Sequence, residues 1–428
     1  MAGNAVKTGL VGGFMQTDLS AAGFSSLGLS SLLTGGLEER NITIPTGIQR
    51  KVITRLLQGE SFLFRSATGT GKTFAYLLPF LQKLFELLNP DISSKGENLE
   101  DKGKTLRGKP LLLILAPTFE LCSQIKTEAD FLLRDVPIHT ALLIGSAAMG
   151  RQIEALKKDR PEVIIGNPGR ILALARQRKL KLTNVRFLVL DEGDRLVQEE
   201  LFGESAEVVA LLKDSSLQRT GCSATIPAKS RERLLSLLGI PASPGSVEED
   251  DSLDVLREKV EHWAFYSPER EKLDLLRSLI AALERAKGKK KNLKALIFTS
   301  RSAQVEMISA RLKAANHPAA GLSGVMDKTR REQCLENFRS GQIRFLVSTD
   351  LAARGLDITD ISHIIALDVS EDRDVYIHRS GRTARAGKGG VMVSIGTEGE
   401  MRRLATLEKN MGITVFPKVL YGGRILSP

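Results

Sequence analysis

The sequence predicts an α/β protein with two tandem domains, each a mainly parallel sheet flanked by helices. Its 428 residues exceed what one typical core holds. Short apolar runs of strand length alternate with amphipathic segments, which is typical of a parallel sheet covered on both faces. The alternation stops at a stretch rich in proline, serine and acid, Ile240 to Asp251, and then starts again.

These breaks in the pattern define the expected domain boundaries. Glycine pairs without a sustained period indicate a flexible N-terminus over residues 1–17. We expect a first domain over residues 18–240, a linker over 241–257, a second domain over 258–415 and a tail over 416–428.

In the first domain, helical spacing leads into Ile44 to Gln49 and on to Leu57. A strand at Leu63 then runs into a glycine-rich loop and a long helix over Phe74–Leu88, and the polar Asn89–Lys109 reads as an exposed loop. The strands expected after it are Leu111–Ala116, Ala141–Leu143, Val163–Ile165, Phe187–Leu190 and Arg219–Cys222. The helices between them are Leu121–Leu133, Arg151–Lys158 and Ile171–Arg176.

The second domain repeats this alternation, beginning with a helix over Glu271–Arg285 and a lysine-rich loop over Lys287–Lys291. The expected strands are Ala295–Phe298, Phe345–Val347, Ile364–Ala366 and Val391–Ile395. The expected helices are Ala303–Ala314 and Lys328–Phe338.

Charge and cysteine content narrow the class of protein. Sixty-one basic residues against fifty acidic ones leave a net charge of +11, which suits phosphate-bearing partners, although solubility alone would also account for it. Three distant cysteines, Cys122, Cys222 and Cys334, form neither a disulfide framework nor a metal spacing, so we expect a soluble intracellular protein. No apolar run reaches the roughly twenty residues of a membrane helix. The sequence does not distinguish nucleus, nucleolus, cytoplasm and mitochondrion. The segment from Met1 to Gln16 has no acidic residue and one base, Lys7, which only weakly indicates a mitochondrial leader.

The stretch from Leu63 to Thr73 has the order of a strand, a phosphate loop and a helix N-terminus. Gly69 and Gly71 would let backbone N–H groups close around phosphate oxygens, Lys72 would pair with the β and γ phosphates, and Thr73 would hold Mg²⁺. The strict spacing requires glycine where this chain has Ser66. A strand-to-helix turn rich in small residues is the alternative.

Two further clusters strengthen the phosphate-loop interpretation. Asp191 and Glu192 end an apolar strand, where a P-loop enzyme would place a magnesium-binding acid and a residue that orients or deprotonates water. From His378, arginines recur every three residues up to Arg385, as a charge clamp on a γ-phosphate requires. A solvated basic patch or an RNA-facing surface would give the same arginine pattern.

Taken in order from about Leu19 to about Gly412, these segments resemble the DEAD-box ATP-dependent RNA helicases, whose core is two tandem RecA-like domains. Pro45 to Gln49 resembles the family's adenine-reading glutamine motif, and Ala67 to Thr73 its form of the phosphate loop. Asp191-Glu192-Gly193-Asp194 stands at the signature tetrapeptide. Later matches are Ser223-Ala224-Thr225, Leu296-Ile297-Phe298, Ser348-Thr349-Asp350, Ala353 to Asp357 and His378 to Arg385.

The resemblance implies an RNA-dependent ATPase that uses ATP and Mg²⁺, with its site complete only when the domains close. It assigns Glu192, Arg382 and Arg385 to catalysis, with both arginines reaching the γ-phosphate, and Thr73 and Asp191 to Mg²⁺. The ATP-binding residues it implies are Gln49, Ala67, Thr68, Gly69, Thr70, Gly71, Lys72, Thr73 and Asp357. Those that would couple hydrolysis to strand separation are Ser223, Thr225, Asp194 and His378.

RNA would lie across both domains, contacted mostly through phosphates and 2′-hydroxyls rather than base sequence. The residues at those positions are Thr118, Gly145, Pro168, Gly169, Arg170, Arg301, Thr349 and Arg354. The family pattern changes at Phe119, Ser146 and Asn167 on this RNA face, and at Gly193 in the signature. Protein cofactors or ribonucleoprotein assemblies are further expected partners; we expect a monomer and no membrane partner.

Two functions remain open from the sequence. The first is an ATP-hydrolysing helicase that unwinds short RNA duplexes or remodels RNA–protein contacts. The second is an ATP-gated RNA clamp or assembly scaffold with little turnover, which the altered RNA-face residues favour. A DNA-directed or nucleotide-kinase-like P-loop protein is a weaker third, because the glutamine motif and the second-domain arginines argue against it.

Overall fold

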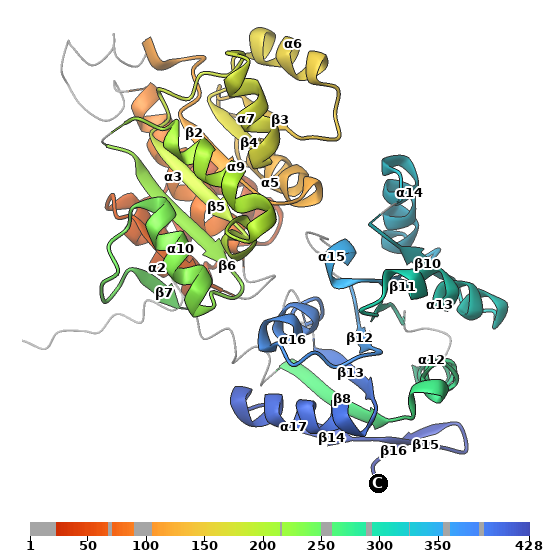
Figure 1. Ribbon diagram of the computed structural model, residues 1–428. Helices are drawn as coiled ribbons and strands as arrows, with labels where there is room; N and C mark the ends of the chain where they lie inside the picture. Colours follow the sequence, from red (N-terminus) through yellow and green to blue (C-terminus); the bar gives the residue numbers. More distant parts are fainter. Residues whose placement is uncertain are drawn as a thin grey trace, which may run out of the picture.

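Two seven-stranded parallel sheets, each carrying helices on both faces, form the computed structural model (Figure 1). The structure describes residues 23–66, 71–89, 105–214, 216–249, 259–287, 293–324, 326–353, 360–384 and 389–428. The strand order of the first sheet is β3-β4-β2-β5-β6-β1-β7, and that of the second is β10-β11-β9-β12-β13-β8-β14. Each strand therefore has a counterpart at the same position in the other sheet, and the predicted α/β fold is confirmed.

The first domain supplies the first seven strands. They are β1 (Phe62–Arg65), β2 (Leu112–Leu115), β3 (Thr140–Leu143), β4 (Val163–Gly166), β5 (Phe187–Asp191), β6 (Gln218–Ser223) and β7 (Val247–Glu249). The helices are η2 (Phe24–Leu27), α1 (Ser31–Glu39), α2 (Gly47–Leu57), α3 (Lys72–Leu88), α5 (Phe119–Leu132), α6 (Met149–Asp159), α7 (Pro168–Arg176), α8 (Gly193–Leu196), α9 (Glu199–Ala210) and α10 (Ala228–Leu238).

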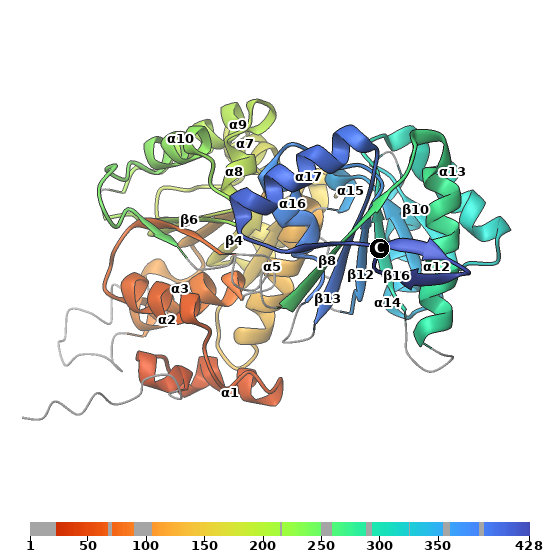
Figure 2. The same ribbon diagram turned by 90° about the horizontal axis from the view of Figure 1, so that it is seen from below.

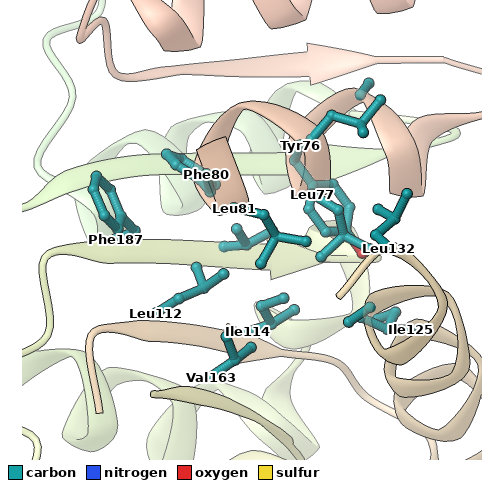
Figure 3. Close-up of a cluster of buried hydrophobic side chains, with 14 of the residues drawn as sticks. Tyr76, Leu77, Phe80, Leu81, Leu112, Ile114, Ile125, Leu132, Val163 and Phe187 are labelled. Carbon is teal, nitrogen blue, oxygen red and sulfur yellow. The ribbon is translucent and has the colours of Figure 1, made fainter. Parts of the chain in front are cut away.

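Alternation along each strand sends side chains into two separate cores. In β2, Leu113 and Leu115 pack with α7, α9 and α10, whereas Leu112 and Ile114 pack with α1, α2, α3 and α5. Figure 2 shows these helix groups on opposite faces of the sheet. Figure 3 shows α3 packed onto the strands through Tyr76, Leu77 and Phe80, all fully buried.

The second domain repeats the arrangement. Its strands are β8 (Val260–Tyr266), β9 (Ala295–Phe298), β10 (Ala319–Leu322), β11 (Phe345–Ser348), β12 (His363–Ala366), β13 (Gly390–Gly396) and β14 (Val415–Pro417), followed by the antiparallel pair β15 (Val419–Tyr421) and β16 (Arg424–Leu426). Its helices are η4 (Glu269–Glu271), α12 (Lys272–Lys287), α13 (Ser302–Ala314), α14 (Lys328–Arg339), α15 (Asp350–Ala353), α16 (Arg373–Ser380) and α17 (Glu398–Met411).

Two expected boundaries differ from the structure. Val247–Glu249, placed in the predicted linker over 241–257, form β7 and pair with β1 at the edge of the first sheet. Residues 416 and 417 of the predicted tail belong to β14, which pairs with β8. Leu420 and Ile425 of the β15–β16 hairpin pack on the hydrophobic core under α12 in the second domain. Short edge strands of this kind carry little periodic signal. The predicted flexible N-terminus, and with it the weak mitochondrial indication, lies outside the described residues.

Candidate functional site at the domain interface

The candidate site lies where three strands of the first sheet end. β1, β5 and β6 are neighbours, and their carboxyl ends lead into Ser66, Glu192 and Ala224. Ligands of open parallel sheets bind at this edge. α3 starts here at Lys72, whose Nζ donates to the Ser66 carbonyl at 2.7 Å. Ala67, Thr68, Gly69 and Thr70 of the predicted phosphate loop lie outside the described residues.

Gln49 joins α2 to the end of the phosphate loop. Gln49 and Thr46 form a capping box, in which the Thr46 N–H donates to Gln49 Oε1 at 2.8 Å. On the other side of the same amide, Gln49 Nε2 donates to the Gly71 carbonyl at 3.1 Å. Gly71 has φ of 87°, and a Cβ there would lie 2.2 Å from Gln49 Nε2. Glycine is therefore required at position 71 both for its backbone conformation and for the approach of Gln49.

Asp191 is a buried carboxylate surrounded by donors. Its Oδ1 accepts from the Glu192 backbone N–H at 2.8 Å and from Cys222 Sγ at 3.2 Å, and its Oδ2 accepts from the Tyr76 hydroxyl at 2.8 Å. Burial raises the pKa of Tyr76 and of Cys222 well above their ordinary values, so both stay protonated donors. These bonds fix the plane of the carboxylate.

The next two residues turn the chain sharply. Glu192 has φ of 48°, a left-handed conformation that is uncommon for a residue with a side chain and recurs at active sites. At Gly193 a Cβ would lie 2.9 Å from Leu234 Cδ2 on α10. A leucine side chain thus fills the space that the family's alanine would use.

Lys72 is the charged centre of this edge. Burial lowers its pKa, while Asp191 and Glu192 oppose that shift and Arg382 adds to it. Arg382 belongs to the second domain, so its charge acts on Lys72 across the domain interface. Arg382 is itself 5% exposed. Arg385 and Asp357 lie outside the described residues.

The four predicted coupling residues meet across the interface. Ser223 Oγ donates to Asp194 Oδ1, and both belong to the first domain. His378, on α16 of the second domain, has Nε2 at 3.2 Å from Thr225 Oγ1 and 4.0 Å from Asp194 Oδ2. The ends of β5 and β6 are thereby joined to α16, which faces the first domain in Figures 1 and 2.

Arg379, the first arginine of the predicted clamp, has a different environment. It is 3% exposed and donates to the carboxylates of Asp350 and Asp368 at 2.7–2.8 Å. It also donates to the Asp368 carbonyl at 2.8 Å. Arg379 is thus committed to the interior of the second domain rather than to the interface.

The predicted RNA-face residues fall into two groups. In the first domain, Thr118 caps α5, Pro168 and Gly169 form the first turn of α7, and Arg170 Nη2 donates to the Gly145 carbonyl at 2.8 Å. In the second domain, Arg301 precedes α13 and Thr349 precedes α15. Arg354 lies outside the described residues. The carboxyl ends of β2, β3 and β4 carry Thr118, Gly145, Gly169 and Arg170. These ends lie on the same edge of the first sheet as the ends of β1, β5 and β6.

Sequence reasoning missed several residues that shape the site. Tyr76 and Cys222 on Asp191 are two of them. Arg331 on α14, where the resemblance keeps the family's arginine, pairs across the domains with Glu120 on α5 and donates to the Ala352 carbonyl at 2.7 Å. A tyrosine one helical turn after Thr73 is a sequence signal that could have revealed Tyr76.

The residues present fit a magnesium ion bound together with a nucleotide. Thr73 and Asp191 offer the hydroxyl and carboxylate oxygens that Mg²⁺ prefers, and few protein ligands suffice when phosphates and waters complete the shell. Within the described residues, no group of three or more His, Cys, Asp or Glu side chains could hold a metal by itself. The same part of the chain contains no helix with the length and apolar content to cross a membrane.

Two parallel sheets, a buried lysine and carboxylate at the carboxyl edge of one and the helix α16 of the other in contact with that edge define a nucleotide-binding protein with tandem RecA-like domains. The DEAD/DEAH box helicase family model matches residues 46–234, and the helicase conserved C-terminal domain model matches residues 271–387. The chain is 35% identical over 387 residues to the DEAD-box ATP-dependent RNA helicase CshC of Bacillus cereus, covering 89% of this chain and 90% of the relative.

A second relative is the probable ATP-dependent RNA helicase YfmL of Bacillus subtilis, 32% identical, with 89% of this chain and 92% of the relative covered. Among solved structures, a Saccharomyces cerevisiae Dbp5 variant bound to RNA and ADP BeF3 is 25% identical with a TM-score of 0.76, covering 93% of this chain and 96% of that one. Mss116p bound to single-stranded RNA and AMP-PNP, at 22% identity and the same TM-score, covers 91% of this chain and 77% of its own, and shows the shared fold. The chain belongs to the DEAD-box ATP-dependent RNA helicase family, which confirms the resemblance.

Proposed function

We propose that the protein is an RNA-dependent ATPase that couples ATP binding and hydrolysis to local RNA duplex unwinding or RNA–protein remodelling. The observation that carries this proposal is the meeting of both domains at one place. His378 contacts Thr225, and Arg331 pairs with Glu120, although each pair joins different domains. A site completed by domain closure is suited to linking nucleotide state to RNA grip.

Each side chain has a defined task in this proposal. Lys72 holds the β and γ phosphates, and Glu192 orients or deprotonates the attacking water. Arg382 and Arg385 stabilise the charge that develops on the γ-phosphate. Thr73 and Asp191 would hold Mg²⁺, which supplies charge neutralisation on the phosphate oxygens. Gln49, already fixed against Gly71, would read the adenine edge through its amide.

The RNA strand would cross both domains on the edge that carries Thr118, Gly145 and Arg170. Backbone contacts would dominate there, so affinity should not depend on base sequence and should fall steeply with salt. Closure would require the strand to follow both surfaces at once, which a regular duplex cannot do, and opening after phosphate release would free it.

Steady-state ATP hydrolysis with and without single-stranded RNA tests the proposal. Wild type should be stimulated by RNA, and Glu192→Gln should lose hydrolysis while still binding nucleotide. Glu200→Gln, an exposed acid on α9, is the matched control and should behave as wild type. An enzyme that hydrolyses ATP equally well with or without RNA would contradict the coupling.

The second candidate, an ATP-gated RNA clamp with little turnover, has support at two substituted positions. Phe119 packs against the first-domain core instead of presenting a charge. Asn167 Nδ2 donates to the Ala116 carbonyl at 3.0 Å, so its amide serves the fold. Tight RNA binding in ATP without measurable hydrolysis would favour the clamp, and strand displacement from a short duplex would favour the helicase.

A further inference from the structure

Tyr76 carries a hydroxyl where packing alone would need only a ring. The side chain is fully buried on α3, among the apolar residues drawn in Figure 3. A buried hydroxyl requires a hydrogen-bond partner, and a phenylalanine would fill the same space without one. Its partner here is Asp191 Oδ2, at 2.8 Å.

The same hydroxyl also meets Thr73. Tyr76 follows Thr73 by one helical turn, so both project from one face of α3. Because the single phenol proton is directed at Asp191 Oδ2, the Thr73 hydroxyl can only be the donor in its hydrogen bond to Tyr76. Protons therefore point from Thr73 to Tyr76 and from Tyr76 to Asp191. Since its proton is directed at Tyr76, the Thr73 oxygen has lone pairs left for a cation.

Asp191, like Thr73, keeps an oxygen lone pair available for a cation. The backbone N–H of Glu192 and the thiol of Cys222 both donate to Oδ1, and Tyr76 donates to Oδ2. A carboxylate oxygen accepts about two hydrogen bonds. Oδ1 is therefore filled, and Oδ2 keeps one lone pair in a direction that Tyr76 fixes.

We propose that Tyr76, assisted by Cys222, is a positioning residue that orients the Thr73 hydroxyl and Asp191 Oδ2 toward a divalent cation bound with the nucleotide. This inference rests on the proposed function, because it concerns the same nucleotide site. Outer-shell partners of metal ligands change metal affinity by about 10–100-fold when removed. Tyr76 contacts both candidate ligands, whereas Cys222 contacts only Asp191. Removing the Tyr76 hydroxyl should therefore lower Mg²⁺ affinity more than removing the Cys222 thiol.

The test is a titration of MgCl₂ against a fixed concentration of the fluorescent nucleotide mant-ADP, read by fluorescence rather than by hydrolysis. Tyr76→Phe should raise the Mg²⁺ concentration at the binding midpoint about tenfold. Its binding of mant-ADP in EDTA should stay within about twofold of wild type, because Tyr76 lies against the ligands and not the base.

Tyr376→Phe is the matched control. Tyr376 is also buried, and its hydroxyl lies 2.8 Å from His262 Nδ1 in the second domain, so the variant loses a comparable bond away from the nucleotide edge. Both variants should unfold at lower temperature than wild type. Only Tyr76→Phe should move the Mg²⁺ midpoint, and equal midpoints in all three folded proteins would overturn the inference.

Cys222 provides an independent second test that also applies if Tyr76→Phe does not fold. Cys222→Ala removes a donor to Asp191 and should raise the Mg²⁺ concentration at the binding midpoint about threefold. Cys222→Ser keeps a donor, so its Mg²⁺ midpoint should equal that of wild type. Identical midpoints for the alanine and serine variants would remove Cys222 from the proposal. Wild type without Mg²⁺-dependent nucleotide binding would refute the proposed function itself. Mg²⁺-dependent wild type with unshifted variants would refute only this inference.

Discussion

Lys72 and Lys272 occupy equivalent positions in the two domains and have opposite surroundings. Each is the first residue of its helix, α3 or α12, and β1 and β8, the strands before these helices, hold the same place in the two sheets. Lys72 Nζ donates to a neutral carbonyl at 2.7 Å. Lys272 Nζ instead pairs with Glu400 at 2.7 Å and Glu269 at 2.8 Å.

The pKa values of the two lysines differ accordingly. Burial lowers the pKa of Lys72, and nearby acids only partly oppose it. Burial also acts on Lys272, but its hydrogen bonds to Glu269 and Glu400 outweigh burial and raise its pKa. An anion supplied by a ligand would add to the partial stabilisation that Asp191 and Glu192 give the charge of Lys72, whereas Glu269 and Glu400 already outweigh burial at Lys272. The same fold thus yields a ligand site in one domain and a rigid support in the other.

The largest effect on nucleotide binding is expected at Lys72. Lys72→Ala should weaken the binding of mant-ATP more than about 100-fold, because the phosphates lose their main cationic contact. Its thermal midpoint should not fall, since a buried lysine with a lowered pKa does not stabilise the fold. Parallel loss of binding and of folding would show that Lys72 is structural.

Arg382 should separate catalysis from binding. Arg382→Ala is expected to lower kcat about 10³-fold while the Kd for ATP changes less than about threefold, because a finger acts mainly in the transition state. RNA-stimulated turnover and mant-ATP binding give the two numbers. Equal losses in kcat and affinity would assign Arg382 to ground-state binding.

Substitution of Lys272 should lower the stability of the fold and leave ATP binding intact, the reverse of what is expected at Lys72. Lys272→Ala should lower the free energy of unfolding by about 2–3 kcal/mol, because it leaves the half-buried carboxylate of Glu400 without its cation. The Kd for ATP should stay within about twofold of wild type. Urea denaturation and nucleotide titration measure both. A large loss of ATP binding in the folded variant would contradict the division between ligand site and support.

A smaller and pH-dependent effect is expected at Asp374 on α16. Burial, with Asp372 and with Asp194 of the first domain, raises its pKa to about 6, against the pull of Arg373 and Arg65. The folded protein therefore takes up a proton between the ordinary pKa of aspartate and about 6. Its unfavourable contribution is full above about pH 6, declines as the pH falls between the two pKa values and is gone below the ordinary pKa of aspartate.

Asp374→Asn should accordingly stabilise the protein by about 1 kcal/mol at pH 7.5, and the difference should shrink below about pH 6 and vanish near about pH 4. Thermal unfolding across this range checks it, with the exposed Glu371→Gln as control. A gain that grows as the pH falls would have the wrong sign.

Much of the fold was predictable because buried strands are short apolar runs. The predicted strand Ala295–Phe298 is β9 with the same bounds, and the predicted helix Ala303–Ala314 begins one residue after the start of α13. β10 was missed because Ala319 to Leu322 contains alanines and a glycine instead of β-branched residues. β7 was missed because two of its three residues are glutamates.

The site was predictable only in part. Phosphate-loop and acid residues stand in contiguous segments, so sequence alone predicted that Lys72, Asp191 and Glu192 lie at one edge of the first sheet. Contacts between distant segments leave no local trace, and the pair Thr225 and His378 is separated by 153 positions. The role of an arginine also depends on its neighbours. Arg379 and Arg382 share one pattern, yet the carboxylates of Asp350 and Asp368 hold Arg379 inside the second domain, away from the site.

The central claim is that nucleotide and RNA together draw both domains around one site. The three native cysteines are buried, so spin labels can be placed selectively on cysteines at the exposed positions Glu154 and Arg311, one in each domain. Pulsed electron–electron distance measurement should give one narrow distribution with ADP·BeF₃ and single-stranded RNA, and a broader, longer one without ligands. In the Lys72→Ala background the ligands should leave the distribution unchanged. Identical distributions with and without ligands, in a labelled protein that still hydrolyses ATP, would contradict the account.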